Sequence, residues 1–159
     1  MNEILKKDRF KILSYVALIL CKNEKILLIR RYKTGIGDGL YGPAGGGIDG
    51  DEPITHAMIR EAREELGIAL QRESLKIVHV LHNKQGQVIN ETETIGFFIQ
   101  ATEWDGEPQN MEPHKHDDVA WFALNDLPCN IKPSVKHVLD MINKNIFFSE
   151  FGWNCDEKE

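Results

Sequence analysis

The stretch that decides the fold runs from Gly46 to Ile68 and reads GGIDGDEPITHAMIREAREELGI. In front of it the chain is dense in glycine, with eight of the thirteen glycines between Gly35 and Gly50. Behind it the apolar residues recur at helical spacing, which predicts a helix from about Pro53 to Leu66. Gly67 is a residue type that commonly follows a helix end. The sequence therefore predicts a glycine-rich loop that leads directly into an amphipathic helix.

Three carboxylates of this predicted helix lie on or beside its apolar face. On a helical wheel, Glu61 and Glu65 fall within or at the edge of the apolar stripe, and Glu64 lies just beyond it. Charged groups are rarely buried without compensation. A hard divalent cation would compensate them, and Mg²⁺ or Mn²⁺ would bring phosphates with it. The alternative is a solvated face on which Arg60 and Arg63 pair with the glutamates.

The glycines in front of the helix have a use that matches these carboxylates. Gly45, Gly46 and Gly47 would let the backbone come close to an ion or a phosphate. The alternative is a flexible surface loop. A glycine-rich loop that continues into an acidic helix favours the first interpretation.

Taken together, residues 46–68 resemble the Nudix box, G-x5-E-x7-R-E-U-x-E-E-x-G-U, where U is aliphatic. Every fixed position is filled, by Gly46, Glu52, Arg60, Glu61, Ala62, Glu64, Glu65, Gly67 and Ile68. Residues 97–124 resemble the later strands of MutT-like members more loosely. One departure lies in front of the box, where Pro43-Ala44-Gly45-Gly46 stands in place of the usual Pro-Gly-Gly.

The resemblance implies an α/β fold, an α/β/α sandwich around a mixed sheet. It also implies metal-dependent hydrolysis of a nucleoside diphosphate linked to a further group. Glu61, Glu64 and Glu65 would then bind Mg²⁺ or Mn²⁺, together with the backbone carbonyl of Gly46. Arg60 would orient these carboxylates with Glu52, and Gly67 would end the helix.

Further site residues come from the same resemblance. Glu112, in NMEPHK, matches an outlying glutamate that members use as a metal ligand or as a base. Arg31 matches a substrate-contacting arginine, and Gly45 would contribute backbone to substrate binding. Asn130 lies one residue away from an asparagine that reads a base in MutT. The general base among Glu64, Glu65 and Glu112 stays open.

We expect a single domain that spans residues 1–159. Strands are predicted over 12–21, 26–29, 75–81, 94–101 and 119–123, with a hairpin turn at 22–25 and a second helix at about 134–144. Because strands and helices alternate, the class is α/β or α+β. The aromatic residues of the tail, 145–159, would cover the body of the protein or a dimer partner.

Composition excludes several other classes of protein. Apolar residues make up 42% and charged residues 28%, which is ordinary for a globular protein. The three cysteines form no CxxC pair, which argues against a disulfide framework or a zinc ribbon. A net charge of −6 lacks the footprint of a nucleic-acid binder. The apolar run 12–21 is too short for a membrane span and no cleavage site follows it, so we expect a cytoplasmic protein.

The substrate is less well indicated than the reaction. The marks of ADP-ribose, dinucleoside polyphosphate and NADH hydrolases downstream of the box are absent, which favours a (deoxy)nucleoside triphosphate, including an oxidised purine one, split to monophosphate and pyrophosphate. The alternatives are an ADP-ribose or nucleotide-sugar pyrophosphatase and a catalytically silent nucleotide sensor, although silent relatives usually lose a glutamate of the box. Residues that would stack on a base or belong to the core are Tyr41, Trp104, Trp121 and Phe122. Those that could touch a phosphate are Lys115 and His116.

Overall fold

The computed structural model describes residues 10–84 and 93–153. Residues 1–9, 85–92 and 154–159 lie outside the described residues, and they include the end of the tail and Cys155. The strands are β1 Leu13–Lys22, β2 Lys25–Arg31, β3 Tyr41–Gly42, β4 Leu75–Lys84, β5 Glu93–Ala101, β6 His116–Ala123 and β7 Phe148–Phe151. The helices are α1 Ile54–Leu66, the short 3₁₀ helix η1 Arg72–Ser74, and α2 Pro133–Asn143.

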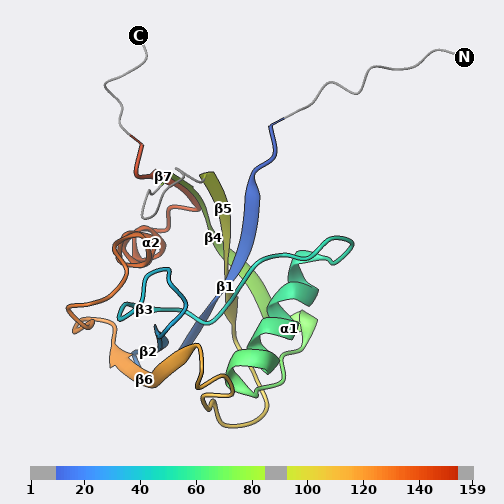
Figure 1. The fold of residues 1–159 in the computed structure, drawn as a ribbon, viewed down its shortest axis with the longest axis vertical. Helices are drawn as coiled ribbons and strands as arrows, with labels where there is room; N and C mark the ends of the chain where they lie inside the picture. The colour runs from blue at the N-terminus through green and yellow to red at the C-terminus, as the bar shows by residue number, and fades with distance from the viewer. Residues whose placement is uncertain (1–9, 85–92, 154–159) are drawn as a thin grey trace, which may run out of the picture.

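The strands of the described residues form one mixed sheet (Figure 1). Its order is β3-β2-β1-β5-β4-β7, and β6 pairs with β2 outside this path. The pairs β1–β5 and β4–β7 are parallel, whereas β1–β2, β2–β3, β2–β6 and β4–β5 are antiparallel. The mixed sheet confirms the predicted fold class.

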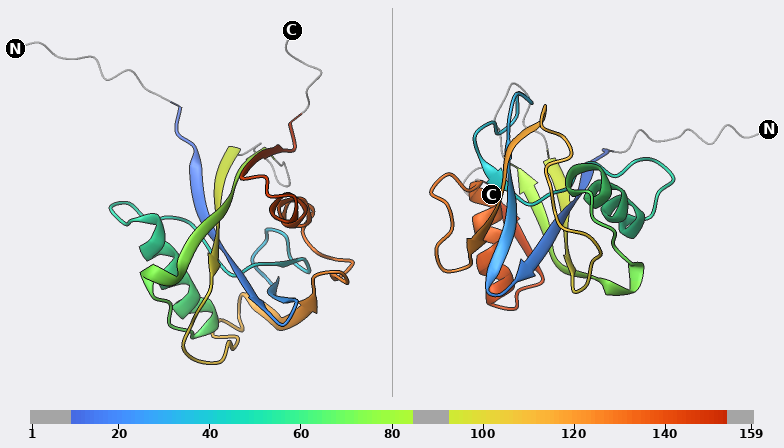
Figure 2. Two further views of the ribbon diagram at one scale, coloured as in Figure 1. Left: turned by 180° about the vertical axis from the view of Figure 1, so that it is seen from behind. Right: turned by 90° about the horizontal axis from the view of Figure 1, so that it is seen from below.

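The two helices cover opposite faces of the sheet (Figures 1 and 2). The alternation of side chains along β1 explains why both faces need a cover. Val16, Leu18 and Leu20 belong to the core under α1, while Ala17 and Ile19 belong to the core under α2. These strand residues are at most 4% exposed, so β1 is buried on both faces, and the molecule is an α/β/α sandwich.

Strand β1 changes partners along its length, and this change opens the sheet. Residues 13–20 pair with β5, but β2 is reached only at Cys21 and Lys22. Over residues 14–18 the edge of β1 that β2 does not reach is occupied by the glycine loop instead. The amides of Val16 and Leu18 donate to the carbonyls of Gly46 and Ala44, at 2.9 and 2.8 Å. The glycine loop is therefore hydrogen-bonded into the sheet.

The predicted helices and longer strands lie within a few residues of their observed bounds, and the aromatic tail contains a strand that the sequence did not predict. Strand β7 pairs with β4 in parallel, after α2 has crossed the sheet. His79 of β4 anchors this strand, because Nδ1 lies 2.8 Å from the carbonyl of Ile146 and Nε2 lies 2.9 Å from Ser149 Oγ. Phe148 and Phe151 thus belong to the sheet edge. No helix in the described residues is long and apolar enough to cross a bilayer.

Candidate active site

Two glutamates of α1 are buried, as the helical wheel predicts. Glu61 is 9% exposed and Glu65 is 7% exposed. The glycine loop lies directly against them, because the amide of Gly45 donates to Glu65 Oε2 at 2.6 Å. A Cβ atom added to Gly46 would lie 2.5 Å from Glu61 Oε1. These two glycines therefore allow the backbone to reach the carboxylates.

Arg60 holds the carboxylates around it in place. Its guanidinium donates to both oxygens of Glu52, with Nη2 2.7 Å from Oε1 and Nε 3.1 Å from Oε2. It also donates to Glu61 Oε1 at 2.6 Å, and more weakly to Glu64 Oε2 at 3.4 Å. Nη2 reaches the carbonyl of Gly47 at 3.1 Å. One side chain thus ties the loop to the helix and fixes the direction of Glu61.

Glu112 reaches the site through a long loop that docks on the end of α1. The amide of Met111 donates to the backbone carbonyl of Glu65 at 3.0 Å, which places Glu112 beside that residue. The amides of Lys115 and His116 then donate to the carbonyl of Glu112, so the chain makes a tight turn. Lys115 Nζ lies 2.8 Å from Glu112 Oε1. The turn is the reason that His116 points back to the glutamates.

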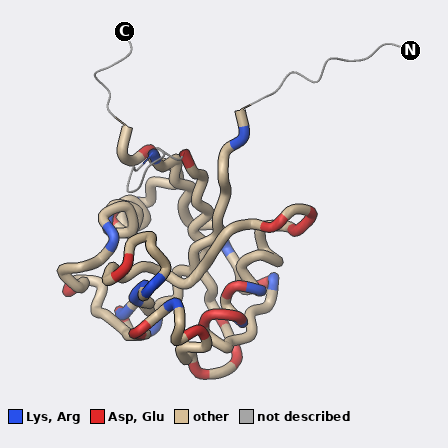
Figure 3. The backbone as a smooth tube through the Cα atoms, in the orientation of Figure 1, with Lys and Arg blue, Asp and Glu red and all other residues tan. Residues whose placement is uncertain are grey.

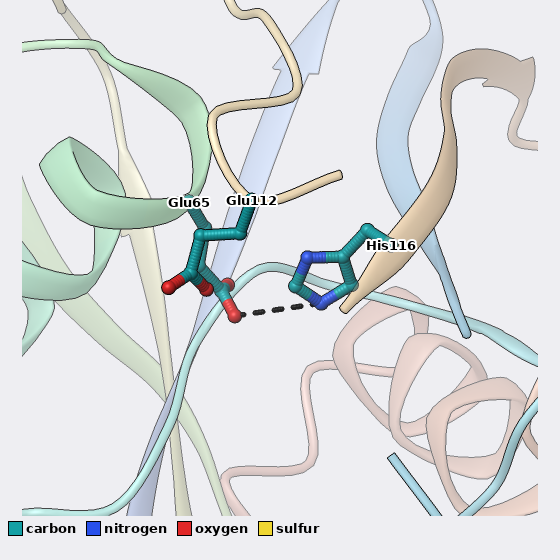
Figure 4. Close-up of side chains that lie close together, drawn as sticks. All are labelled: Glu65, Glu112 and His116. Carbon is teal, nitrogen blue, oxygen red and sulfur yellow. Dashed lines mark ion pairs between the residues drawn. The ribbon is translucent and has the colours of Figure 1, made fainter. Parts of the chain in front are cut away.

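Glu65, Glu112 and His116 form a compact cluster (Figure 4). One potential ligand atom of each lies within 4.8 Å of the others. His116 Nε2 is 3.6 Å from Glu65 Oε1, and the buried Nδ1 of His116 has no hydrogen-bond partner in the described residues. Sequence reasoning missed His116 as a candidate ligand. Its spacing of four residues from Glu112 was the available signal, since a single helical turn brings such a pair together.

Burial favours the protonated form of the two buried carboxylates. Burial raises the pKa of Glu65 to about 8, although the hydrogen bond from Gly45 opposes the shift. Burial also raises the pKa of Glu61. In contrast, the hydrogen bonds from Arg60 lower the pKa of Glu52 to about 2. Figure 3 shows further acidic residues on and around α1. When these carboxylates are ionised, the site therefore holds negative charge that a nearby positive charge must balance.

The carboxylate set fits a hard divalent cation. Burial lowers the pKa of His116, so the imidazole beside Glu65 is a poor counter-charge and a suitable neutral ligand. Among the described residues the cationic partner of Glu61 is Arg60, which also pairs with Asp49, Glu52 and Glu64. Two ionised, buried carboxylates with so little positive charge are costly, and oxygen-rich sites of this kind suit Mg²⁺ or Mn²⁺.

A cavity of about 590 Å³ adjoins the carboxylates. Glu65 and His116 line it, together with Gly45, Gly46 and Arg31. This volume is in the range of small-molecule sites. Arg31 ends β2, and its Nε lies 3.2 Å from Thr34 Oγ1. The residues of the cavity that the sequence did not single out include Asn83, Thr94 and Lys132.

Other expected residues lie elsewhere. Asn130 does not line this cavity among the described residues, because its Nδ2 donates to the carbonyl of Gly39 at 2.7 Å. The candidate stacking residues pack with one another instead, Trp104 against Trp121 and Tyr41 against Phe122. Gly67 takes the left-handed conformation at the end of α1, with φ of 69°.

Comparison with known proteins identifies the class. The NUDIX domain family model matches residues 12–142. The chain therefore belongs to the NUDIX domain family, and it is a hydrolase of pyrophosphate bonds that acts on nucleotide substrates. Enzymes of this family use a divalent metal ion.

Particular relatives are similar over different lengths. The crystal structure of a MutT NUDIX hydrolase from Burkholderia pseudomallei is 30% identical, with a TM-score of 0.74, and covers 82% of this chain and 98% of that one. An oxidized purine nucleoside triphosphate hydrolase of Danio rerio is 27% identical over 114 residues, 71% of this chain and 68% of that protein. The CTP pyrophosphohydrolase of Escherichia coli (strain K12) is 43% identical over 58 residues, 36% of this chain and 43% of that protein.

Proposed function

We propose that the protein hydrolyses (deoxy)nucleoside triphosphates to the monophosphate and pyrophosphate in the presence of Mg²⁺ or Mn²⁺. The observation that carries this proposal is the position of Glu65, whose buried carboxylate lies on the wall of the 590 Å³ cavity. The reacting phosphates would lie at the carboxylates and the nucleoside would enter the cavity. The names of the two curated relatives described above, both of them triphosphate hydrolases, support the same substrate class.

The metal would be held by the carboxylates of Glu61, Glu64, Glu65 and Glu112, with the carbonyl of Gly46 beside them. His116 is a further candidate ligand on the same wall. When bound, a divalent ion neutralises phosphate oxygens and lowers the pKa of a water molecule.

The side chains of the site divide the remaining work. Water forms a bond to phosphorus as the bridging P–O bond breaks, so its proton must pass to a base, which we assign to the set Glu64, Glu65 and Glu112. Arg60 fixes the direction of Glu61 through the 2.6 Å hydrogen bond. Arg31, on the cavity wall, would contact the bound nucleotide. This division follows the geometry of the site and the family resemblance together.

A panel of nucleotides tests the proposal. The panel contains ribo- and deoxyribonucleoside triphosphates, 8-oxo-dGTP, ADP-ribose and nucleotide sugars, each with Mg²⁺, and products are identified by ³¹P NMR. We expect monophosphate and pyrophosphate from triphosphates, with the highest kcat/KM in that group. A higher kcat/KM for ADP-ribose or a nucleotide sugar would replace this substrate class. Binding without turnover of any compound would indicate a sensor.

A further inference from the structure

The cavity has a polar end that the proposed chemistry does not use. Asn83 of β4 is 8% exposed and lines the cavity, and its buried Oδ1 has no hydrogen-bond partner in the described part of the chain. Thr94 of β5 is its direct cross-strand neighbour, and the buried Oγ1 of Thr94 is equally unpartnered there. Buried polar atoms without partners are costly. A pair of them beside one cavity points to a polar ligand.

This pair approaches the cavity from the face of the sheet opposite to the carboxylates. Asn83 follows Leu81 by two residues in β4, so both side chains point to the same face. Leu81 belongs to the core under α2, whereas Glu65 comes from α1 on the other face. If the phosphates of a nucleotide are held at Glu65, the base of that nucleotide would therefore lie at Asn83.

A lysine faces the same space. Lys132 directly precedes α2, and its amide donates to the carbonyl of Tyr41 at 2.9 Å, which fixes its backbone. Its half-buried side chain lines both the main cavity and an adjoining one of about 120 Å³, and so does Asn83. Burial and the charge of Arg31 lower the pKa of Lys132. Among the described residues, no acidic side chain pairs with it.

These groups have a definite hydrogen-bonding preference. The ammonium of Lys132 only donates, so it requires an acceptor on the ligand. The amide of Asn83 offers an acceptor and a donor side by side, which matches an edge that carries a ring N–H next to a carbonyl oxygen. An amino group at the carbonyl position would face the ammonium with its own donors. Tyr15 and Phe98 line the same cavity and supply apolar surface for a ring.

We propose that Asn83 and Lys132 select nucleotides whose base has a carbonyl next to a ring N–H, such as guanine, hypoxanthine or uracil, over the corresponding amino bases adenine and cytosine. Thr94 contributes a further hydrogen bond to that base. The proposal rests on the proposed triphosphate hydrolysis and names the base that this site takes.

Two matched substrate pairs test the selection. ITP and ATP differ in the 6-oxo edge against the 6-amino edge, and UTP and CTP differ in the same way at position 4. The comparison is made in whichever pair contains the nucleotide with the highest kcat/KM. In that pair we expect the kcat/KM of the oxo nucleotide to be about tenfold or more above that of its amino counterpart. A preference for ATP over ITP, or for CTP over UTP, would overturn the proposal.

Variants separate base recognition from phosphate binding. Lys132→Met and Asn83→Leu should bring the oxo-to-amino ratio of kcat/KM close to one, whereas the exposed control Lys136→Met should leave it unchanged. If Lys132→Met weakens both members of a pair equally, the lysine binds phosphate and the proposal is wrong. Thermal melting shows that each variant is folded, and Thr94→Val gives a second variant on the same wall.

Equilibrium binding distinguishes failure of this inference from failure of the proposed function. Titration of the wild-type protein with IMP and AMP reports on the cavity even if no triphosphate is hydrolysed. Tighter binding of IMP, lost in Asn83→Leu, would support base selection in that case. Equal binding of IMP and AMP by the wild-type protein would overturn it, whichever reaction the enzyme catalyses.

Discussion

Arg60 and Glu52 form a two-point ion pair eight residues apart, with 2.7 and 3.1 Å between their nitrogen and oxygen atoms. The pair leaves Nη1 free to hold Glu61 at 2.6 Å. Removal of the charge of Glu52 should therefore loosen Glu61, a proposed metal ligand, through Arg60.

We predict that Glu52→Gln lowers activity or apparent Mg²⁺ affinity about 10- to 100-fold, the usual effect of losing such a supporting contact. The measurement is kcat as a function of Mg²⁺ concentration. Glu73→Gln, an exposed glutamate in η1, is the control and should behave as wild type. Unchanged Mg²⁺ dependence and unchanged kcat in Glu52→Gln would contradict a positioning role.

Glu64 is the half-exposed member of the carboxylate set, with 50% of its side chain accessible. We predict that Glu64→Gln lowers kcat by about three orders of magnitude or more, because it removes a charge at the metal and phosphate site. The melting temperature should change little, since the side chain keeps its shape. Near-normal turnover would remove Glu64 from the proposed machinery. Comparison of the pH–rate profiles of Glu64→Gln and Glu112→Gln would separate ligand from base.

The three consecutive glycines should respond differently to alanine. At Gly45, φ is 150° and a Cβ atom would lie 2.0 Å from the carbonyl oxygen of Val16, so Gly45→Ala should cost about 3 kcal/mol or more of stability. Gly46→Ala should displace Glu61 and lower kcat about a hundredfold. Gly47→Ala meets no atom within 4 Å and is the neutral control. Denaturant unfolding and steady-state kinetics measure both effects, and equal behaviour of the three variants would contradict the geometry.

Stability of the metal-free protein should depend on pH through Glu65. Its pKa rises from an ordinary value of 4.5 to about 8 in the folded protein. Between these values the folded state binds more protons than the unfolded state, so the free energy of unfolding falls as pH rises. Added Mg²⁺ should stabilise the protein more at pH 8 than at pH 5, because it favours the ionised carboxylate. Melting curves with EDTA or Mg²⁺ across this pH range test the direction of the change in stability. A metal-free protein that becomes more stable as pH rises would contradict the role of Glu65.

The parts of the fold that could be predicted are those that depend on residues close together in the sequence. The apolar spacing of 54–66 and the glycine after it identify α1, and the same wheel predicts the burial of Glu61 and Glu65. Strand β7 could not be predicted in this way, because Phe148–Phe151 is short and pairs with β4 only after α2 has crossed the sheet. The cavity depends on still longer contacts. Asn83 and Lys132 are 49 positions apart in sequence and line the same cavity because α2 packs on β4.

The candidate site shows the same division. The Nudix box locates Arg60 and its glutamates from one continuous segment, whereas Glu112 and His116 depend on how residues 105–115 dock on α1. That docking uses backbone hydrogen bonds from Gln109 and Met111 to the end of the helix. Backbone contacts of this kind leave no mark in the side-chain pattern, so the sequence offers only the four-residue spacing of Glu112 and His116 and not their position beside α1.

The interruption of the sheet beside β1 has a consequence for redesign. The segment 44–48 occupies an edge of β1 that β2 does not cover, and β3 already pairs with β2 at Ile29 and Arg30. A shorter loop would therefore leave the amides of Val16 and Leu18 without partners instead of bringing β2 onto β1. A redesign for greater rigidity should keep this loop and change residues elsewhere.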